Sequence, residues 1–225
     1  MSLIEKILNP LSAFHHKRIF MYLRNLDIDK IIDVGAHKGE FLEKMLKIEK
    51  VNSFYVFEPQ KNIFNELNNK FDKNKKVTLF NYAMDNEIAN KKLKINKLSM
   101  KSSLAETNEK SLYLKFINFL LLSKSSFDDE YEIQTNTVDK VFDGINLQKT
   151  LLKIDVEGFE MNVIKGSQMK LKEIPFILLE NQFGNHFKNN NFSEIIRFLS
   201  DEKFVICKKF LFPTLHYQDV LFKKI

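Results

Sequence analysis

The chain has 225 residues, 44% of them hydrophobic and 28% charged, which is typical of a soluble globular protein that buries one core. The net charge of +6 would suit an anionic partner, but the lysines are spread along the whole chain, so we expect no nucleic-acid partner. The single cysteine, Cys207, excludes an intrachain disulfide and a multi-cysteine zinc site and fits a protein of the reducing cytoplasm.

Residues 1–29 are predicted to form an N-terminal helical segment. The apolar side chains that recur there at helical spacing are Leu3, Ile7, Leu8, Leu11, Phe14, Ile19, Phe20 and Leu23. Pro10 is expected to break or kink this helix. The histidines His15, His16 and His216 have no partner pattern, and we interpret them as surface residues.

Residues 30–225 are predicted to form one α/β domain. Strand-like runs at 31–34, 53–57 and 77–82 alternate with amphipathic helical stretches, which is the βαβαβ pattern of a parallel sheet with helices on its faces. Right-handed crossovers then place these strands in the order 3-2-1. The expected fold class is therefore α/β, a Rossmann-like three-layer sandwich.

Residues 105–130 interrupt this pattern and are interpreted as an insertion. Within it, Leu112 to Leu122 form an apolar helical stretch, far shorter than the roughly 20 residues that span a membrane. We therefore predict no transmembrane segment, although contact with a membrane surface stays open. The stretch is interpreted as a lid or interface helix over the ligand site, with an ordinary core-packing helix as the alternative.

Strands and helices alternate again after the insertion. A strand at 150–155 leads into a helix that Gly166 is expected to close at its C-terminus. Another buried strand follows at 175–179. The β-rich stretches 204–209 and 216–222 predict an antiparallel pair, so the mostly parallel sheet is expected to have an antiparallel C-terminal strand.

Polar residues gather where the predicted strands end, which is the edge at which doubly wound sheets bind ligands. The first group is Asp33-x-Gly35-x-x-x-Gly39, whose glycines let the backbone turn sharply and approach a ligand. Its spacing differs from the Gly-x-Gly-x-x-Gly of dinucleotide enzymes, which disfavours a dehydrogenase. A smaller zwitterionic ligand is more natural than a pyrophosphate.

Carboxylates follow two further strands. Glu58 ends the second strand, where a carboxylate can accept hydrogen bonds from both hydroxyls of a ribose, although a merely solvated carboxylate is the alternative. Asp155 and Glu157 flank a strand-to-helix turn at Gly158. They cannot both be buried and charged without partners, so they either face a polar cleft or, like Glu160, cap the next helix.

These segments resemble the FkbM-type methyltransferases. The motifs that carry the resemblance are Asp33-Val34-Gly35-Ala36-His37-Lys38-Gly39, Phe57-Glu58-Pro59, Ile154-Asp155-Val156-Glu157-Gly158-Phe159-Glu160, Val163-Ile164-Lys165-Gly166, Thr137-Val138-Asp139 and Ser102-Ser103-Leu104. The resemblance extends from about residue 30 to residue 180. His37 departs from the asparagine that is usual in the family's first motif, but both side chains can donate a hydrogen bond.

The resemblance implies a class I methyltransferase fold, S-adenosylmethionine as cofactor, and methyl transfer to hydroxyl oxygens, commonly on sugars or sugar-like natural products. It also implies a set of cofactor-binding residues: Asp33, Gly35, Ala36, His37, Gly39, Glu58, Ala83, Met84 and Asp155. In this set the glycine-containing turn would wrap the methionine end, Glu58 would hold the ribose, and Ala83 and Met84 would flank the adenine. Met84 could equally belong to the core.

A sugar hydroxyl is a poor nucleophile until its proton is removed, so a base or a metal should lie near the methyl group. The candidate catalytic residues are Asp155, Glu157 and His186. Asp155 with Glu180 and Asn181 also resembles the set by which catechol-type O-methyltransferases bind Mg²⁺, and these are hard oxygen ligands. The alternative is that Glu180 and Asn181 only shape the adjoining loop.

The leading hypothesis is a cytoplasmic O-methyltransferase that uses S-adenosylmethionine, with or without Mg²⁺, on a glycan or another sugar-bearing small molecule. A non-catalytic or RNA-binding protein on the same fold is the first rival, and an NAD-dependent sugar-modifying enzyme is the second. The chain has no tract of interleaved basic and aromatic residues, which argues against RNA. The sequence predicts neither the acceptor nor the oligomeric state.

Overall fold

The computed structural model describes residues 3–95, 102–103, 129–183, 192–214 and 217–225. The strands of the main sheet are β1 (Lys30–Val34), β2 (Ser53–Phe57), β3 (Val77–Phe80), β8 (Thr150–Ile154), β9 (Phe176–Gln182), β10 (Phe204–Leu211) and β11 (Tyr217–Lys224). Those of a smaller sheet are β4 (Ala83–Met84), β5 (Asn90–Ile95), β6 (Ser102–Ser103) and β7 (Asp129–Asn136). The helices are α1 (Leu3–Leu23), α2 (Glu40–Met45), α3 (Lys61–Phe71), α5 (Val138–Val141), α6 (Glu160–Lys165), α7 (Phe192–Asp201) and the 3₁₀-helix η1 (Lys170–Lys172).

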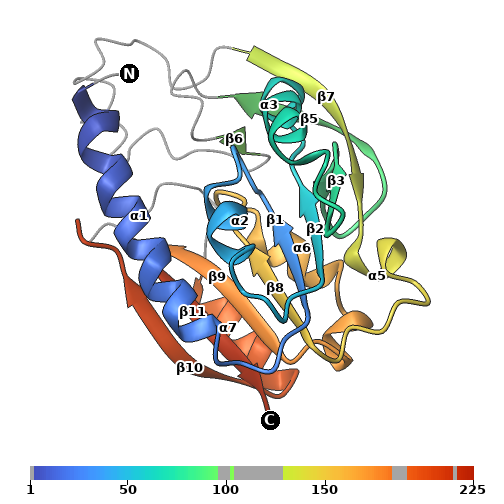
Figure 1. Cartoon of the computed structure of the whole chain (residues 1–225). Coiled ribbons are helices and arrows are strands. Elements are labelled where there is room, and N and C mark those ends of the chain that lie inside the picture. Colours follow the sequence, from blue (N-terminus) through green and yellow to red (C-terminus); the bar gives the residue numbers. More distant parts are fainter. Residues whose placement is uncertain (1–2, 96–101, 104–128, 184–191, 215–216) are drawn as a thin grey trace.

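The main sheet has the order β10-β11-β9-β8-β1-β2-β3 (Figure 1). Neighbouring strands from β9 to β3 run parallel, and β11 is antiparallel to both β9 and β10. The predicted 3-2-1 order and the antiparallel C-terminal pair are therefore confirmed. Strands β1 to β3 follow one another toward one edge of the sheet, whereas β8 and β9 follow toward the other edge. The carboxyl ends of β1 and β8 therefore form the switch point.

Helices cover both faces of this sheet, which confirms the three-layer sandwich. Because side chains alternate along a strand, Ile31 packs with α1, α2 and α3, whereas Ile32 packs with α5, α6 and α7. Figure 1 shows α1 and α2 in front of the sheet and α7 behind β11. We find no helix long and apolar enough to cross a membrane among the described residues.

The N-terminal helix corrects three sequence-based expectations. It does not end at Pro10, because a proline removes one N–H donor but leaves the other backbone hydrogen bonds of the helix in place. Phe14, expected on the apolar stripe, is 55% exposed, whereas His15, expected at the surface, is 1% exposed. The buried stripe runs through His15, Ile19 and Leu23, which are spaced four residues apart.

Gly166 is needed for a different reason from the one that the sequence indicates. It follows α6 in an ordinary right-handed conformation, not in the left-handed conformation of a terminating glycine. A Cβ atom at this position would lie 1.9 Å from the carbonyl oxygen of Asp85. The glycine therefore permits close contact between α6 and the segment that follows β4.

The smaller sheet was not predicted as a unit. Strand β7 pairs antiparallel with β5 and parallel with β4. Its sequence alternates, with Glu132 and Gln134 exposed but Ile133 and Thr135 buried, which is the pattern of a half-buried strand. The predicted helix at Leu112 to Leu122, with most of the insertion 105–130, lies outside the described residues.

Candidate active site

The turn between β1 and α2 packs tightly against the end of β8. Gly35 has a φ of +80°, and a Cβ atom on it would lie 1.9 Å from the carbonyl oxygen of Asp155. Gly39 also has a positive φ, and a Cβ atom there would lie 2.7 Å from side-chain carbons of Leu67 and Phe71 on α3. Both glycines thus allow other segments of the protein to pack closely against the turn, in addition to the expected close approach of a ligand.

Three consecutive backbone N–H groups of this turn bond to the end of β2. Gly35 and Ala36 both donate to the carbonyl of Phe57, at 3.0 and 3.1 Å. His37 donates to Oε2 of Glu58 at 2.9 Å, with a φ of 49° that is unusual for a side-chain-bearing residue. These donors hold the turn in place and are engaged within the protein.

Glu58 is the carboxylate around which this end of the sheet is organised. Its second oxygen, Oε1, accepts the backbone N–H of Gln60 at 2.9 Å, and the residue is only 5% exposed. Burial raises the pKa of Glu58, while the N–H groups of Gln60 and His37 oppose the rise. Each carboxylate oxygen keeps a lone pair beyond its backbone bond, so the site can still accept hydroxyl donors.

Asp33 and Lys153 form a buried ion pair across β1 and β8. The two residues are register partners, and Lys153 Nζ lies 2.9 Å from Asp33 Oδ1 and 3.4 Å from Asp155 Oδ2. The same ammonium donates to the carbonyl of Gly35 at 3.0 Å. It therefore connects the glycine turn with the end of β8.

Neighbouring charges and burial shift the pKa values of both members of this pair. Burial would lower the pKa of Lys153, but the carboxylates of Asp33 and Asp155 outweigh it and raise that pKa above its ordinary value. Burial raises the pKa of Asp33, and the cation of Lys153 opposes the rise. Lys153 accordingly stays a cation throughout the physiological range.

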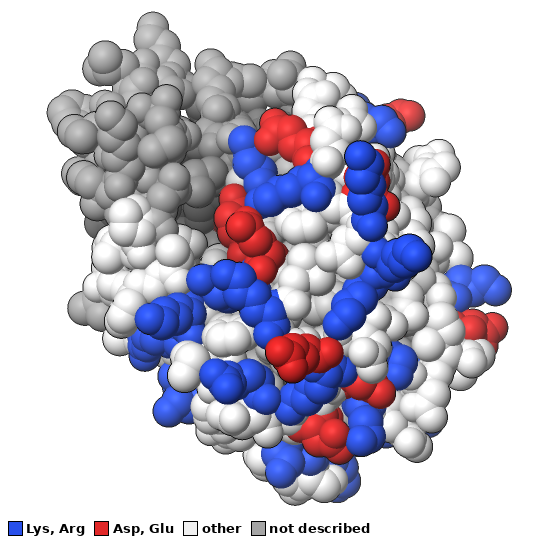
Figure 2. All heavy atoms as spheres, in the orientation of Figure 1, with Lys and Arg blue, Asp and Glu red and all other residues white. Residues whose placement is uncertain are grey.

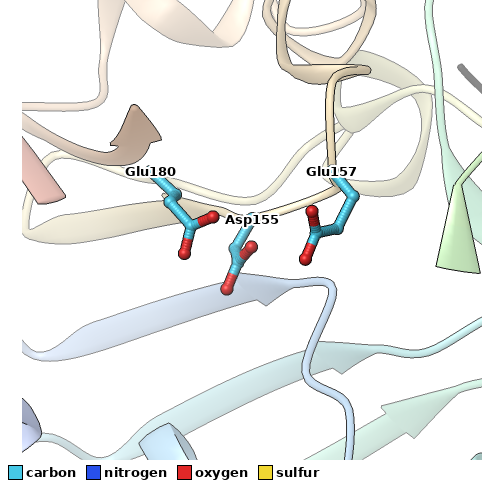
Figure 3. Close-up of side chains that lie close together, drawn as sticks. All are labelled: Asp155, Glu157 and Glu180. Atoms are coloured by element: carbon cyan, nitrogen blue, oxygen red, sulfur yellow. The ribbon is translucent and has the colours of Figure 1, made fainter. Parts of the chain in front are cut away.

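Three carboxylates gather beyond the ends of β8 and β9. Asp155, Glu157 and Glu180 each offer an oxygen within 4.8 Å of the others, and Figure 3 shows all three pointing toward the same space. Gln182 joins two of them, because its Nε2 donates to Glu157 and, at 2.8 Å, to Glu180 Oε1. The group is part-buried, so it can meet a ligand from solvent.

Glu160 shapes the turn that carries two of these carboxylates. Its Oε1 accepts the N–H of Gly158 at 3.0 Å and that of Val156 at 3.4 Å. The side chain is buried, and burial, together with nearby Asp155 and Glu157, raises the pKa of Glu160 to about 7. Neither residue caps α6 as predicted: Glu160 binds N–H groups of the turn before the helix, and Glu157 joins the carboxylate group.

Other predicted site residues lie in different surroundings. Ala83 and Met84 form β4, and Met84 is 1% exposed within the main core. Asn181 follows Glu180 within β9, which extends beyond its predicted end, and successive strand residues point to opposite faces. Asn181 therefore does not point with Glu180. His186 lies outside the described residues, as does His216.

Sequence reasoning missed several polar residues of this region. Lys153 had a usable signal, because a lysine inside a buried strand run must find a carboxylate partner. Gln182 had none, since it needs β9 to extend past Glu180. The pair formed by His15 and Asp219, with His15 Nε2 at 2.6 Å from Asp219 Oδ2, joins residues 204 positions apart.

Comparisons with known proteins agree with this architecture. A family model described as the methyltransferase FkbM domain matches residues 33–206. A protein of the NADB-Rossmann superfamily from Streptococcus agalactiae is 11% identical with a TM-score of 0.51, and the match covers 93% of this chain and 67% of that one. A precorrin-6y C5,15-methyltransferase from Geobacter metallireducens GS-15 is 10% identical with a TM-score of 0.51, over 93% of this chain and 87% of that one.

A third solved structure, TrmK of M. capricolum, was determined with its cofactor product S-adenosylhomocysteine. It is 9% identical with a TM-score of 0.50, and the match covers 91% of this chain and 67% of that one. At such identities the likeness shows the fold alone, and no curated protein matches the sequence. The family match, in contrast, spans most of the chain and contains the glycine turn, Glu58 and the three carboxylates. The chain therefore belongs to the FkbM family of S-adenosylmethionine-dependent methyltransferases.

Proposed function

We propose that this methyltransferase acts on a hydroxyl oxygen of a sugar, a glycan or a sugar-like metabolite. The observation that carries the proposal is the group of three part-buried carboxylates, Asp155, Glu157 and Glu180, in an FkbM-family chain whose glycine turn packs against the backbone of Asp155. A hydroxyl needs a group that removes its proton, and carboxylates can do so or can hold a metal that does. They also accept hydrogen bonds from the several hydroxyls of a sugar.

The cofactor would lie along the switch point of the sheet. The turn at Gly35, Ala36, His37 and Gly39 would wrap its methionine end, and Glu58 would accept from the ribose hydroxyls. Two observations fit this placement. Glu58 keeps acceptor capacity beyond its two backbone bonds, and Asp33, which is fully buried, has a second carboxylate oxygen that finds no hydrogen-bond partner in the described part of the chain. Ala83 and Met84 would lie nearest the adenine, although Met84 is also a core residue.

S-adenosylmethionine supplies a methyl group on a positively charged sulfur. Asp155 is the residue proposed to accept or orient the hydroxyl proton, because it leads directly out of β8 at the switch point. Its backbone N–H donates to the carbonyl of Val34 at 3.0 Å, and Lys153 Nζ lies beside its carboxylate. Glu157 is held by Gln182, and together with Glu180 it would bind the remaining acceptor hydroxyls. His186 stays a further candidate base.

A divalent cation is the alternative way to activate the hydroxyl. The three carboxylate oxygens are hard ligands of the type that Mg²⁺ prefers. If the ion binds here, Asp155 and Glu180 would hold it, with Glu157 in the role first considered for Asn181. The face of the molecule in Figure 2 gives no comparable support to an RNA substrate, since its Lys and Arg side chains are scattered and interspersed with acidic ones.

Calorimetry with S-adenosylmethionine, S-adenosylhomocysteine and NAD tests the cofactor. We expect the first two to bind and NAD not to bind; binding of NAD alone would refute the proposal. Transfer of a radiolabelled methyl group to a panel of monosaccharides, oligosaccharides and RNA then tests the acceptor class. Label that enters only RNA would refute a sugar acceptor.

The mechanism can be tested on the acceptor so identified. If Asp155 is a metal-free base, Asp155→Asn should lower the rate by about 10²–10⁴-fold with nearly unchanged cofactor affinity. If the carboxylates hold Mg²⁺, EDTA should abolish turnover and added Mg²⁺ should restore it. Near-wild-type turnover of Asp155→Asn, with and without EDTA, would remove Asp155 from the mechanism and leave His186 as the better candidate.

A further inference from the structure

The buried stripe of α1 changes from apolar to polar along its length. Ile19 and Leu23 are 1% and 0% exposed and pack in the same core cluster as Leu178 and Leu221 of the sheet. One helical turn before Ile19 the stripe continues with His15, which is equally buried. The helix therefore presents a histidine where its regular spacing would otherwise place another apolar residue.

The face of the sheet beneath α1 also changes from apolar to polar. Leu178 of β9 lies opposite Leu221 of β11, and two residues further along, Glu180 lies opposite Asp219. Directly opposed residues of antiparallel strands point to one face, so Glu180 and Asp219 extend from the face that α1 covers. The acidic end of the sheet and the histidine of α1 thus meet at the same level.

His15 and Asp219 bind each other in this position. His15 Nε2 lies 2.6 Å from Asp219 Oδ2, and both residues are buried. His15 Nδ1 has no hydrogen-bond partner among the described residues. An ionised Asp219 can only accept, so Nε2 of His15 carries the proton of this bond.

The pair is also close to the proposed reaction site. The rings of Phe212 and Tyr217 lie 5.2 and 5.5 Å from that of His15 and hold it from the side. Asp219 lies opposite Glu180, one of the three carboxylates. Burial raises the pKa of Asp219, the hydrogen bond from His15 and the cation of Lys153 oppose the rise, and the charge of Asp155 adds to it. Asp219 therefore belongs to the same electrostatic environment as the three carboxylates.

We propose that α1 is part of the active site, and that His15 is a positioning residue that fixes the carboxylate of Asp219, so that its negative charge favours the cationic cofactor over the neutral product. Neither residue lies in the segment matched by the family model, residues 33–206. The inference rests on the proposed function in one respect, the use of S-adenosylmethionine. It adds a residue from the N-terminal helix to the site.

The test compares affinities for S-adenosylmethionine and S-adenosylhomocysteine, since only the first carries a charged sulfur. His15→Phe keeps an aromatic ring between Phe212 and Tyr217 but removes the donor. His15→Gln keeps an N–H group that can reach Asp219, and Asp219→Asn removes the charge with little change in shape. Lys17→Ala, exposed on the same helix, is the matched control.

Calorimetry on the full chain, with thermal melting to check folding, should give a distinct pattern. His15→Phe and Asp219→Asn should each lower the ratio of the two affinities by about fivefold to tenfold, the order expected when one charge of the site is lost or displaced. His15→Gln and Lys17→Ala should keep the ratio within about twofold. The double variant His15→Phe/Asp219→Asn should lose no more than Asp219→Asn alone, because both changes remove one interaction.

An unchanged ratio in folded Asp219→Asn would overturn the inference, even where His15→Phe proves too unstable to measure. Additive losses in the double variant would overturn it as well, since His15 would then act independently of Asp219. A wild-type chain that binds neither ligand would instead refute the proposed function, and the inference with it. Measuring the wild type first separates these failures.

Discussion

Replacing Lys153 by methionine should destabilise the protein more than any surface substitution of lysine. The side chain of Lys153 is 7% exposed and that of Asp33 is 1% exposed, so neither charge has water as a substitute partner. Methionine matches the length of the aliphatic part of lysine but carries no charge. Lys153→Met would therefore leave the carboxylate of Asp33 buried and unpaired.

The magnitude follows from the cost of an uncompensated buried charge, which is about 3–5 kcal/mol. In a domain of this size 1 kcal/mol shifts the melting temperature by roughly 2–4 °C, so a fall of roughly 6–20 °C is expected. The cost is not larger, because Asp155 is one-third exposed and its carboxylate can turn toward water. Asp33 itself can take up a proton, since burial already raises its pKa.

Urea and thermal unfolding of Lys153→Met would be compared with Lys165→Met, which changes an exposed lysine of α6. The double variant Asp33→Asn/Lys153→Met should recover part of the loss, because it neutralises both members of the pair. If Lys153→Met matched Lys165→Met within about 0.5 kcal/mol, the ion pair would not organise this part of the fold.

Three further predictions concern neighbouring parts of the site. Glu58→Ala should weaken S-adenosylmethionine binding at least about tenfold in calorimetry, through loss of two charge-assisted hydrogen bonds; unchanged affinity in a folded variant would remove its role. Gly35→Ala should unfold at lower urea concentration than Gly144→Ala. Both glycines have positive φ, but only at position 35 would the Cβ atom lie against the Asp155 carbonyl. Equal losses of stability in the two variants would contradict the packing argument. Because burial raises the pKa of Glu160 to about 7, the folded chain keeps a proton that the unfolded chain releases, and the free energy of unfolding should fall by roughly 2–3 kcal/mol as pH rises from about 5 to 7. Glu160→Gln should flatten this decline, and a profile as steep as that of the wild type would assign it to another group.

The sequence predicts the parts of this protein that local patterns specify. Buried runs such as 31–34 and 53–57 identify the strands, and chain handedness then sets their order. Gly35 and Glu58 stand out because glycine and carboxylate at strand ends are chemically specific. These features depend on residues a few positions apart, which is the range over which periodicity and turn chemistry operate.

Residues whose partners are distant in sequence could not be placed in this way. His15 looks like a surface histidine until β11 brings Asp219 beneath α1, and the helical stripe admits either Phe14 or His15 at that turn. Lys153 was accessible in principle, since β1 and β8 meet at the switch point and Asp33 lies opposite it. Inferring that pair needs the strand order first and the burial argument second.

The position of β11 has a consequence for synthesis of the chain. This strand lies between β9 and β10 although it follows both in sequence, and β10 pairs with β11 within the described sheet. While a ribosome has yet to deliver β11, β10 cannot join the sheet, and the open edge of β9 can pair with strands of other chains. Stalled or truncated products that lack β11 should therefore be prone to aggregation, whereas completed chains close that edge at once.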